Sequence, residues 1–519
     1  MLGHKSQRNP PPSCGWGDNW GIRRLLGAAW LASALISAGP ARAAFDGLQY
    51  IASYPDLIRA FGANAAAGAA HYVQYGKAEG RVEDGFDERQ YLANYADLRV
   101  AFGNDGTAAT FHYIQNGLAE GRTDKTNFIV ILADDLGWGE VGTQHVGDIA
   151  TPNIDAIARA GVTFSNGYAL ANLCIPSRAG LLTGRYPQEF GVYHNLPAPV
   201  PPRVGLPPGE VTLAEALHTR GYVTGLVGKW HLGRKPEDNP LHHGFDEFFG
   251  VLDSNRPYFG EDATNPLLRG TTPVLASGYL TDTLAAEAAS FIGRHAAQPF
   301  FLFVPFTAVH TPLAAKPEIL ARLSGIGNPT RRLLAAVLAS LDEGVGTITA
   351  AVRGAGIADR TIMVFLGDNG CNTGTGCRNR PLRGAKGTYW EGGIRVPFLM
   401  SWPGRVAAGS GYGRPVMAFD LFATFLHAAG GTPPPGADGI DLLPYLDGAG
   451  GDPYPYLFWG GRSNGATRKG DWKLLGAELY DLGRDLGEQR NVASDNPGVV
   501  ADLRAARTAW LGTLVPPLW

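Results

Sequence analysis

The sequence predicts an α/β fold built on a mainly parallel central sheet. From Lys125 onward, apolar runs of strand length alternate with helical patterns, which is typical of α/β proteins. Four runs are continuously apolar, as in strands buried on both faces of a parallel sheet. They cover residues 128–132, 222–227, 300–306 and 362–366.

Polar side chains follow each of these four runs. In chain order they are Asp134 and Asp135, then Lys229 and His231, then His310, and finally Asp368 and Asn369. Open parallel sheets bind ligands just beyond the carboxyl ends of their strands. The four runs therefore predict a single active site at that edge of the sheet.

Length and composition indicate a globular protein. The chain has 519 residues, enough for two or three domains with a large core. Hydrophobic residues make up 45% and charged residues 18%, which excludes a disordered chain. A net charge of −3 gives no sign of a nucleic-acid partner, which would need a basic surface. With four cysteines, the chain is not a disulfide scaffold.

Residues 1–43 are typical of a secretory signal peptide. Arg23 and Arg24 precede an apolar run over 25–38, and the small residues of 40–43 suit cleavage near Ala43. The run is shorter than the roughly 20 apolar residues of a membrane span. The arginine pair also fits a twin-arginine leader, so the export route stays open. We expect a periplasmic or secreted protein with no membrane span in its mature chain.

Residues 44–123 contain a tandem repeat. Phe45 recurs as Phe86 and His71 as His112, so the offset is constant (86 − 45 = 41). Each unit predicts two short helices joined by a glycine-containing turn. The two histidines fit either metal ligation or packing against aromatic side chains, and packing is favoured because no other ligand type clusters with them. We interpret this module as a binding or spacer element.

The remaining chain is predicted to divide into a catalytic domain over 124–448 and a subdomain over 449–519. Gly- and Pro-rich segments separate the two. In the second part, strand-like segments at 456–459, 472–475 and 478–480 precede a helical pattern over 499–511. These segments predict a small antiparallel sheet packed on the main sheet.

Asp134, Asp135, Asp368 and Asn369 form an all-oxygen set of candidate metal ligands. Three carboxylates and one amide suit a hard cation such as Ca²⁺ or Mg²⁺ rather than zinc. Taken singly, Asp-Asp and Asp-Asn-Gly are ordinary turn sequences. Because both pairs follow predicted buried strands, we favour the metal site.

Cys174 opens a segment that predicts the start of a helix, Cys174-Ile175-Pro176-Ser177-Arg178. Pro176 suits the first helical position, where its missing N–H costs nothing. Cys174 would then lie at a helix N-terminus, where backbone N–H groups favour an anion. The alternative is a buried structural cysteine beside a turn.

Together these segments resemble the type I, formylglycine-dependent sulfatases of the alkaline phosphatase superfamily. The Cys-x-Pro-Ser-Arg signature at Cys174 is the most specific, and the resemblance covers about residues 125–492. Further matching phrases are ILADDLGWG (131–139), GKWHLG (228–233), FLGDNG (365–370), PLRGAKG (381–387) and EGGIRVP (391–397). The resemblance implies an alkaline-phosphatase-like α/β/α sandwich.

The resemblance also implies a mechanism. A formylglycine-generating enzyme would convert Cys174 to formylglycine, whose hydrated aldehyde attacks the sulfate ester. The implied ligands of a Ca²⁺ ion, with Mg²⁺ as the alternative, are Asp134, Asp135, Cys174, Asp368 and Asn369. The resemblance implies that Arg178 neutralises the anionic groups and that Lys229 bridges the nucleophile and the sulfate. His231 would be the general base. His310 and Lys386 would contact the sulfate and help to protonate the leaving oxygen.

Other residues near these motifs have weaker expectations. Arg383 and Arg395 are expected to form structural ion pairs. His194, His242 and His243 fit either the substrate entrance or solvated loops. Removal of the leader would remove Cys14 and leave three cysteines. The simplest interpretation is that Cys371 pairs with Cys377 while Cys174 is converted. Whether Cys371 and Cys377 form a disulfide is left undecided by the sequence.

The sequence thus predicts an arylsulfatase-like sulfuric ester hydrolase. The alternatives are a phosphonate or phosphate ester hydrolase with the same nucleophile and metal, and a non-catalytic extracellular binding protein. The phrases HGFDEFFG (243–250) and NRPLRG (379–384) resemble the arylsulfatase and N-acetylgalactosamine-sulfatase branch, which favours a sulfated sugar as substrate. The loop over 252–272 should decide the substrate but contains no readable motif.

Overall fold

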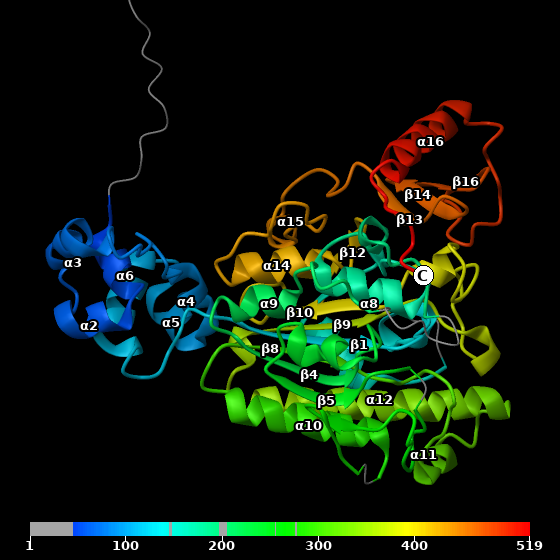
Figure 1. The fold of residues 1–519 in the computed structure, drawn as a ribbon, viewed down its shortest axis with the longest axis horizontal. Helices are drawn as coiled ribbons and strands as arrows, with labels where there is room; N and C mark the ends of the chain where they lie inside the picture. Colours follow the sequence, from blue (N-terminus) through cyan, green and yellow to red (C-terminus); the bar gives the residue numbers. More distant parts are fainter. Residues whose placement is uncertain (1–44, 145–147, 197–204, 255, 276–277) are drawn as a thin grey trace, which may run out of the picture. The chain divides into compact units, whose positions relative to one another are not determined.

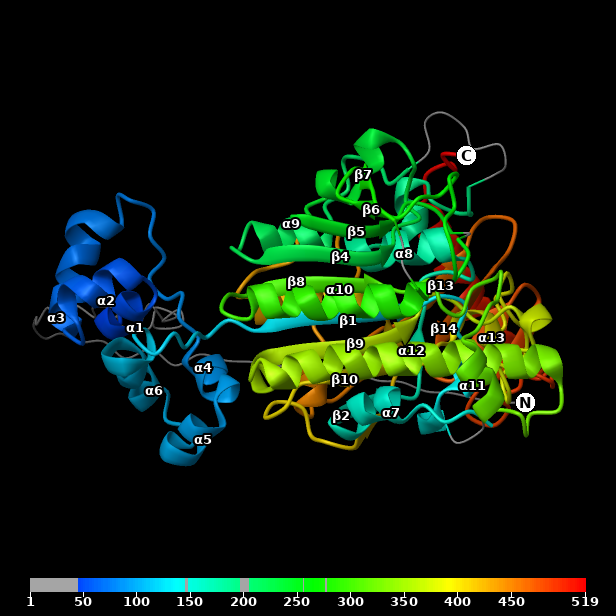
Figure 2. The same ribbon diagram turned by 90° about the horizontal axis from the view of Figure 1, so that it is seen from below.

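A computed structural model describes residues 45–144, 148–196, 205–254, 256–275 and 278–519. The predicted signal peptide therefore lies outside the described residues. A ten-stranded sheet forms the centre of the fold, in the order β11-β2-β10-β9-β1-β8-β4-β5-β6-β7 (Figure 2). In that order, its strands are Ser410–Tyr412, Gly161–Phe164, Phe398–Ser401, Thr361–Gly367, Asn127–Ala133, Phe300–Pro305, Val223–Lys229, Glu247–Val251, Leu268–Arg269 and Thr272–Pro273.

The four predicted apolar runs are the four adjacent strands β9, β1, β8 and β4. All three pairings among them are parallel. Strand β5 pairs parallel with β4, while β10, β6 and β7 add antiparallel pairings toward the two edges. The prediction of a mainly parallel sheet is confirmed, and the carboxyl ends of the four central strands lie at one edge.

Strand β1 shows why this sequence forms a central strand. All seven of its residues are buried. Successive side chains of a strand point to opposite faces, so Phe128, Val130 and Leu132 enter one core while Ile129 and Ile131 enter the other. A strand that packs on both faces needs a continuous apolar run, which is what the sequence provides.

Helices cover both faces of the sheet (Figure 1). One core contains residues of α8 (Cys174–Thr183), α9 (Leu213–His218) and α14 (Asp420–Ala428). The other contains residues of α7 (Pro152–Arg159), α10 (Leu280–His295), α11 (Pro317–Arg322) and α12 (Pro329–Gly354). This arrangement is a three-layer α/β/α sandwich, as expected. A two-stranded sheet of β3 (Gly167–Tyr168) and β12 (Val416–Met417) and the short helices α13 (Glu391–Ile394) and α15 (Leu443–Leu446) complete this part.

Helix α12 is long and apolar enough to cross a membrane by length and composition. In this fold, however, 67% of its apolar window is buried inside the protein. Its buried residues, such as Leu338 and Leu341, belong to the core that also contains Ile292 of α10 and Val304 of β8. The contacts of α12 are those of a core helix.

The C-terminal segment forms a separate four-stranded antiparallel sheet with a helix. Its strands are β13 (Leu457–Gly460), β14 (Gly465–Lys469), β15 (Trp472–Leu475) and β16 (Glu478–Asp481), followed by α16 (Pro497–Leu511). The antiparallel prediction is confirmed, but β14 was missed. Trp459 and Ala466 belong to the same core as one face of the ten-stranded sheet, so this subdomain packs on the part of the chain that contains that sheet.

The duplicated segment forms three helices per unit rather than the two predicted. The helices are α1 (Gly47–Ala52), α2 (Pro55–Phe61) and α3 (Ala65–His71) in the first unit, and α4 (Glu88–Asn94), α5 (Ala96–Phe102) and α6 (Gly106–His112) in the second. A π-helical turn continues α3 and α6. The predicted first helix splits because Tyr54 and Tyr95 adopt an extended conformation, with φ of −136° in both units.

The two repeat histidines pack against aromatic rings, as favoured from the sequence. His71 Nδ1 lies 3.1 Å from the Tyr50 hydroxyl, and His112 Nδ1 lies 2.9 Å from the Tyr91 hydroxyl. His71 also contacts the ring of Phe61, and His112 that of Phe102. Neither histidine belongs to a metal-ligand cluster found within the described residues.

Candidate active site

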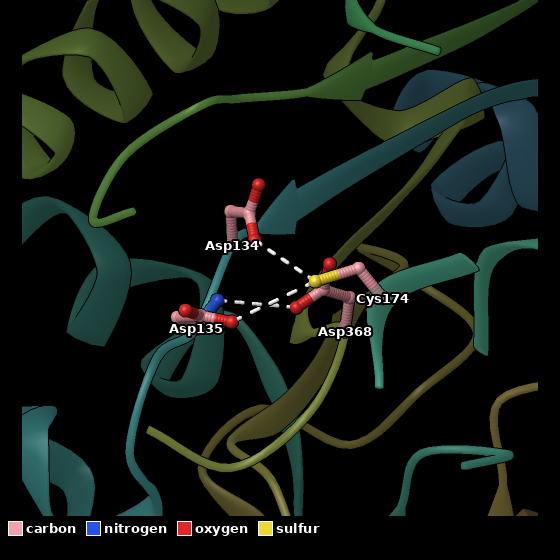
Figure 3. A group of neighbouring side chains, drawn as sticks. All are labelled: Asp134, Asp135, Cys174 and Asp368. Atoms are coloured by element: carbon pink, nitrogen blue, oxygen red, sulfur yellow. Dashed lines mark hydrogen bonds between the residues drawn. The ribbon is translucent and has the colours of Figure 1, made fainter. Parts of the chain in front are cut away.

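Four side chains that could hold a metal ion meet at the carboxyl edge of the central strands (Figure 3). Asp134 and Asp135 follow β1, Asp368 follows β9, and Cys174 is the first residue of α8. One ligand atom from each lies within 4.8 Å of the others, and all four residues are buried. The Cys174 Sγ is 3.6 Å from Asp134 Oδ1 and 3.7 Å from Asp135 Oδ1.

The loops after β1 and β9 are joined by their own polar groups. Asp135 has a φ of 58°, in the left-handed region that aspartate tolerates better than most residues. In this conformation its backbone N–H donates to Asp368 Oδ1 at 3.1 Å. Asn369 Nδ2 donates to Asp135 Oδ1 at 2.8 Å. These bonds hold the candidate ligands of two strands together.

Helix α8 places Cys174 at its N-terminus, as the sequence predicted. All ten of its residues are buried, and it ends at Gly184, whose φ of 70° suits glycine. The helix begins at Cys174, so Pro176 is its third residue and the prediction of the first position was wrong. Since the first four N–H groups of a helix lack intrahelical partners, proline is tolerated there too. The N–H of Ile175 donates to Asn195 Oδ1 at 3.0 Å.

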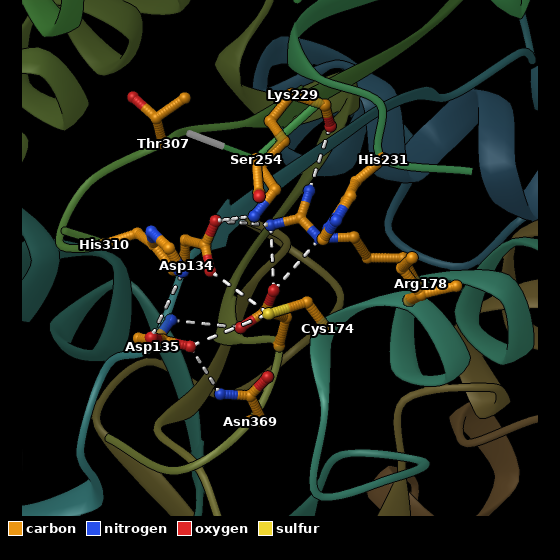
Figure 4. Close-up of polar contacts among 12 residues, drawn as sticks. Asp134, Asp135, Cys174, Arg178, Lys229, His231, Ser254, Thr307, His310 and Asn369 are labelled. Atoms are coloured by element: carbon orange, nitrogen blue, oxygen red, sulfur yellow. Dashed lines mark hydrogen bonds and ion pairs between the residues drawn. The ribbon is translucent and has the colours of Figure 1, made fainter. Parts of the chain in front are cut away.

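Two buried cations neutralise the carboxylates (Figure 4). Arg178, one turn after Cys174, donates from Nε and Nη2 to Asp368 Oδ2 at 3.0 and 2.8 Å. Its Nη1 donates to the carbonyl of Lys229 at 2.9 Å. Lys229 Nζ donates to Asp134 Oδ2, which also lies 3.3 Å from Arg178. Arg178, Lys229, Asp134 and Asp368 have fully buried side chains.

Lys386 and His310 lie on the more accessible side of the cluster. Lys386 Nζ is 2.6 Å from Asp135 Oδ1, and His310 Nε2 is 3.7 Å from Asp135 Oδ2. Their side chains are 16% and 14% exposed, whereas Cys174 is completely buried. The Tyr258 hydroxyl donates to the carbonyl of His310 at 2.9 Å and so helps to fix the loop after β8. Lys386 and His310 are therefore the more solvent-accessible members of the cluster.

His231 follows β4 with a φ of 62°. Burial lowers the pKa of His231 far below its usual value, and the nearby charges of Lys229 and Arg178 lower it further. The imidazole is therefore held in its neutral form. Its Nε2 is 3.8 Å from Asp253 Oδ1, and among the described residues its Nδ1 has no hydrogen-bond partner.

The donor set fits a hard divalent cation. Asp134, Asp135 and Asp368 offer carboxylate oxygens, and the buried Oδ1 of Asn369 has no hydrogen-bond partner among the described residues. An unsatisfied buried carbonyl oxygen beside three carboxylates is costly unless a cation or a water satisfies it. Oxygen ligands of this kind suit Ca²⁺ or Mg²⁺.

The Cys174 side chain is a poor thiolate in this environment. Burial raises the pKa of the thiol far above its usual value, and the carboxylates of Asp368 and Asp134 raise it further. For Asp134 itself, burial alone would raise the pKa of the carboxyl, but the charges of Lys229, His310 and Arg178 bring it below its usual range. Because thiolate is the reactive form of cysteine, unmodified Cys174 is a weak nucleophile here.

The two arginines expected to form structural ion pairs behave differently. Arg395 pairs with Glu391 at 3.3 Å, as expected. Arg383 instead donates to the carbonyl of Glu488 at 2.7 Å and lies 3.7 Å above the Trp390 ring. No ion pair of Arg383 is found within the part of the chain that the structure describes.

The three other histidines lie in different environments. His194 and His242 are exposed, in accordance with solvated loops. His243 is buried and its ring lies 5.4 Å from that of Trp230, so both expectations for this residue were wrong. Cys371 and Cys377 form a disulfide. It closes the loop after the Asp368-Asn369 pair.

All ten predicted site residues are thus brought together at one edge of the sheet. Asp253 and Asn195, which contact His231 and the start of α8, were not predicted. Both lie in irregular segments without a motif, and only their tertiary position identifies them. Asp253 also forms an ion pair with Arg234.

A mostly parallel sheet flanked by helices, with carboxylates and basic groups at its carboxyl edge, defines an α/β protein of the alkaline-phosphatase-like class. Comparison with known proteins then identifies the family. The model of the sulfatase family matches residues 126–431, more than half of the chain. The chain belongs to the sulfatase family.

Named relatives agree with this assignment. The chain is 38% identical over 347 residues to N-acetylgalactosamine-6-sulfatase of Homo sapiens, covering 62% of this chain and 65% of the relative. It is 37% identical over 364 residues to human arylsulfatase A, covering 64% and 70%. The match thus spans slightly less than two thirds of the length of the first relative.

A solved structure, Ps i-CgsB, is 34% identical to this chain, with a TM-score of 0.73. The likeness covers 76% of this chain and 94% of that one. The same protein has been solved in complex with k-i-k-neocarrahexaose.

Proposed function

We propose that this chain is a sulfatase that hydrolyses sulfate esters with a nucleophile derived from Cys174. The observation that carries the proposal is the position of Cys174 at the head of α8. Its Sγ lies within 3.7 Å of two carboxylates of a candidate metal site. Buried basic side chains surround the same point.

The charge balance of the site supports an anionic substrate. The carboxylates of Asp134, Asp135 and Asp368 are matched by the cations of Arg178, Lys229 and Lys386. A divalent cation bound by this set would leave two positive charges uncompensated. Such a site attracts a tetrahedral oxyanion and stabilises negative charge that develops in the transition state.

Conversion of Cys174 explains how a residue with a poor thiolate becomes a nucleophile. Formylglycine, once hydrated, supplies one hydroxyl to attack sulfur and a second whose deprotonation expels sulfate from the covalent intermediate. Such covalent catalysis divides a difficult hydrolysis into two easier steps. In the converted residue those oxygens are bonded to Cβ, and the Cys174 Sγ marks approximately where one of them would lie, near the N–H groups of α8 that favour an anion.

The basic residues of the site differ in how deeply they are buried. Arg178 and Lys229 are buried beside the carboxylates, where they orient the nucleophile and neutralise its charge. Lys386 and His310 lie on the solvent side, where the sulfate oxygens and the leaving oxygen would be. They are placed to bind sulfate and to protonate the departing alcohol. His231, neutral because it is buried, would accept the proton in the second step.

The cation would be Ca²⁺, with Mg²⁺ as the alternative, held by Asp134, Asp135, Asp368, Asn369 and the converted Cys174. When bound, it supplies Lewis-acid stabilisation for the nucleophile and the sulfate. The all-oxygen donor set supports this choice over zinc.

The substrate class proposed is a sulfated carbohydrate. Human N-acetylgalactosamine-6-sulfatase is a relative, and Ps i-CgsB has been solved in complex with k-i-k-neocarrahexaose. We further propose export to the periplasm or beyond after cleavage near Ala43, and maturation by a formylglycine-generating enzyme. The proposed domains are a signal peptide (1–43), a repeat module (44–123), a catalytic domain (124–448) and a C-terminal subdomain (449–519).

Two measurements on protein co-expressed with a formylglycine-generating enzyme test the proposal. Mass spectrometry of the peptide containing Cys174 should detect the aldehyde. Initial rates on paired aryl sulfate and aryl phosphate esters should favour the sulfate, and Cys174→Ala should abolish both rates. A preference for the phosphate ester would replace the sulfatase by the phosphate ester hydrolase alternative. Retained activity of Cys174→Ala would remove Cys174 from the mechanism.

A further inference from the structure

The loop that carries Lys386 closes on itself before α13. The N–H of Gly392 donates to the carbonyl of Arg383 at 2.7 Å, so the two ends of the loop are adjacent. Within it, the N–H of Lys386 donates to the carbonyl of Cys371 at 3.0 Å. The loop thus presents the ammonium group of Lys386 to Asp135 but contributes no strand to the central sheet. Its middle is also held by the N–H of Gly387, which donates to the carbonyl of Asn172 at 2.9 Å. The position of the loop therefore depends on these bonds together with the contacts at its ends.

Glu488, a residue of the C-terminal subdomain, contacts both ends of this loop. Its backbone carbonyl accepts a hydrogen bond from Arg383 Nη1 at 2.7 Å, and its carboxylate Oε2 accepts one from the N–H of Glu391 at 2.7 Å. Glu488 is completely buried and has a φ of 51°. A buried glutamate in the left-handed region persists only where surrounding contacts hold it, and such residues cluster at functional sites.

Lys473 of β15 holds the carboxylates of Glu488 and Glu391 together. Its Nζ is 2.8 Å from Glu391 Oε1 and 2.8 Å from Glu488 Oε1, and all three side chains are fully buried. The other oxygen of Glu391 accepts from the Tyr168 hydroxyl at 2.6 Å. Since an uncompensated buried charge is strongly destabilising, the two carboxylates must remain where Lys473 is.

We propose that Lys473 and Glu488 are positioning residues for Lys386, so that the C-terminal subdomain is part of the catalytic machinery. The contacts run from Lys473 to Glu488 and Glu391, from these to the two ends of the loop, and from the loop to the Lys386 ammonium beside Asp135. Neither Lys473 nor Glu488 touches the candidate nucleophile. The inference rests on the proposed sulfatase function, in which Lys386 binds sulfate and protonates the leaving oxygen.

The test uses a charge-balanced double variant, Lys473→Met with Glu488→Gln, which removes one positive and one negative charge. A displacement of about 1 Å can cost on the order of 100-fold in rate. We therefore expect kcat for an aryl sulfate to fall about 10- to 100-fold, with a smaller change in KM. Lys473→Arg should retain part of the rate. The matched control is Lys469→Met. Lys469 lies on β14 and forms an exposed ion pair with Asp502. The kcat of this variant should stay within about twofold of the wild-type value, because exposed pairs contribute little.

A double-mutant cycle with Lys386→Ala separates positioning from general destabilisation. If the two residues act through Lys386, the double variant should lower kcat by less than about twofold further in the Lys386→Ala background. An equal loss in both backgrounds, or no loss at all, would overturn the inference. Should the double variant fail to fold, Arg383→Gln removes the side-chain bond to the Glu488 carbonyl, the stacking on Trp390 and the contact with Tyr480, and the same cycle applies. An inactive wild-type enzyme on all sulfate esters would instead overturn the proposed function.

Discussion

Glu391→Gln should destabilise the protein in a pH-dependent manner. Burial alone would raise the pKa of Glu391, but the charges of Lys473, Arg395 and Arg468 lower it from 4.5 to about 2. A carboxyl whose folded-state pKa is lowered contributes stability above its unfolded pKa and loses it as the pH falls through the folded one. The difference of about 2.5 units, at 1.36 kcal/mol each, corresponds to about 3 kcal/mol at pH 7.5. At pH 3, between the two values, this contribution shrinks to less than half of that at pH 7.5.

Urea unfolding followed by tryptophan fluorescence at pH 7.5 and pH 3 measures this difference. The matched control is Glu237→Gln, because Glu237 forms an ion pair with Lys235 in which the Glu237 side chain is 69% exposed. Such exposed pairs contribute less than about 1 kcal/mol. A Glu391→Gln deficit that is equal at both pH values, or no larger than that of the control at pH 7.5, would refute the electrostatic reasoning.

Three further outcomes are expected. The Cys174→Ser variant should release at most one alcohol per enzyme molecule. Mass spectrometry should then detect one sulfuryl group bound to the protein, since serine has no second hydroxyl to expel that group. Sustained turnover would contradict the mechanism. Asn369→Ala should weaken Ca²⁺ binding, measured by calorimetry, by at least about tenfold. Mutation of a residue that only contacts a metal ligand already lowers metal affinity by about that much. An unchanged affinity would remove Asn369 from the ligand set. Asp342→Ala should lower the free energy of unfolding by about 2 kcal/mol, because Asp342 accepts the N–H groups of Asn153 and Ile154 at 3.0 and 2.8 Å at the start of α7. An unchanged urea midpoint would show that this cap is dispensable.

The central strands were predictable because their apolar runs reflect burial on both faces. Strand β14 was not, because its sequence Gly-Ala-Thr-Arg-Lys is polar. Arg468 is nevertheless buried, since its guanidinium bonds the Tyr168 hydroxyl and the carbonyl of Gly470. Buried polar strands of this kind depend on partners far away in the chain, which a local pattern does not contain. The split of the first repeat helix likewise depends on the extended conformation of single tyrosines.

The candidate site was predictable wherever a side chain belongs to a motif at a strand end. Lys386 was found from its motif, although it follows no strand, but the contacts of Lys473 and Glu488 with its loop were not predicted. Glu488 is 102 positions further along the chain (488 − 386 = 102). Its role follows from a backbone carbonyl and an unusual φ, neither of which leaves a signal in the amino-acid pattern.

The two copies of the duplicated segment can be compared residue by residue, like two aligned sequences. Both copies place an arginine 4.8 Å above a tyrosine ring, Arg81 over Tyr54 and Arg122 over Tyr95. Elsewhere they have diverged: Val73 of the first copy is 80% exposed, while its counterpart Ile114 is 6% exposed. Identical substitutions made in the two copies would therefore measure one interaction in two surroundings, with each copy acting as the internal reference for the other.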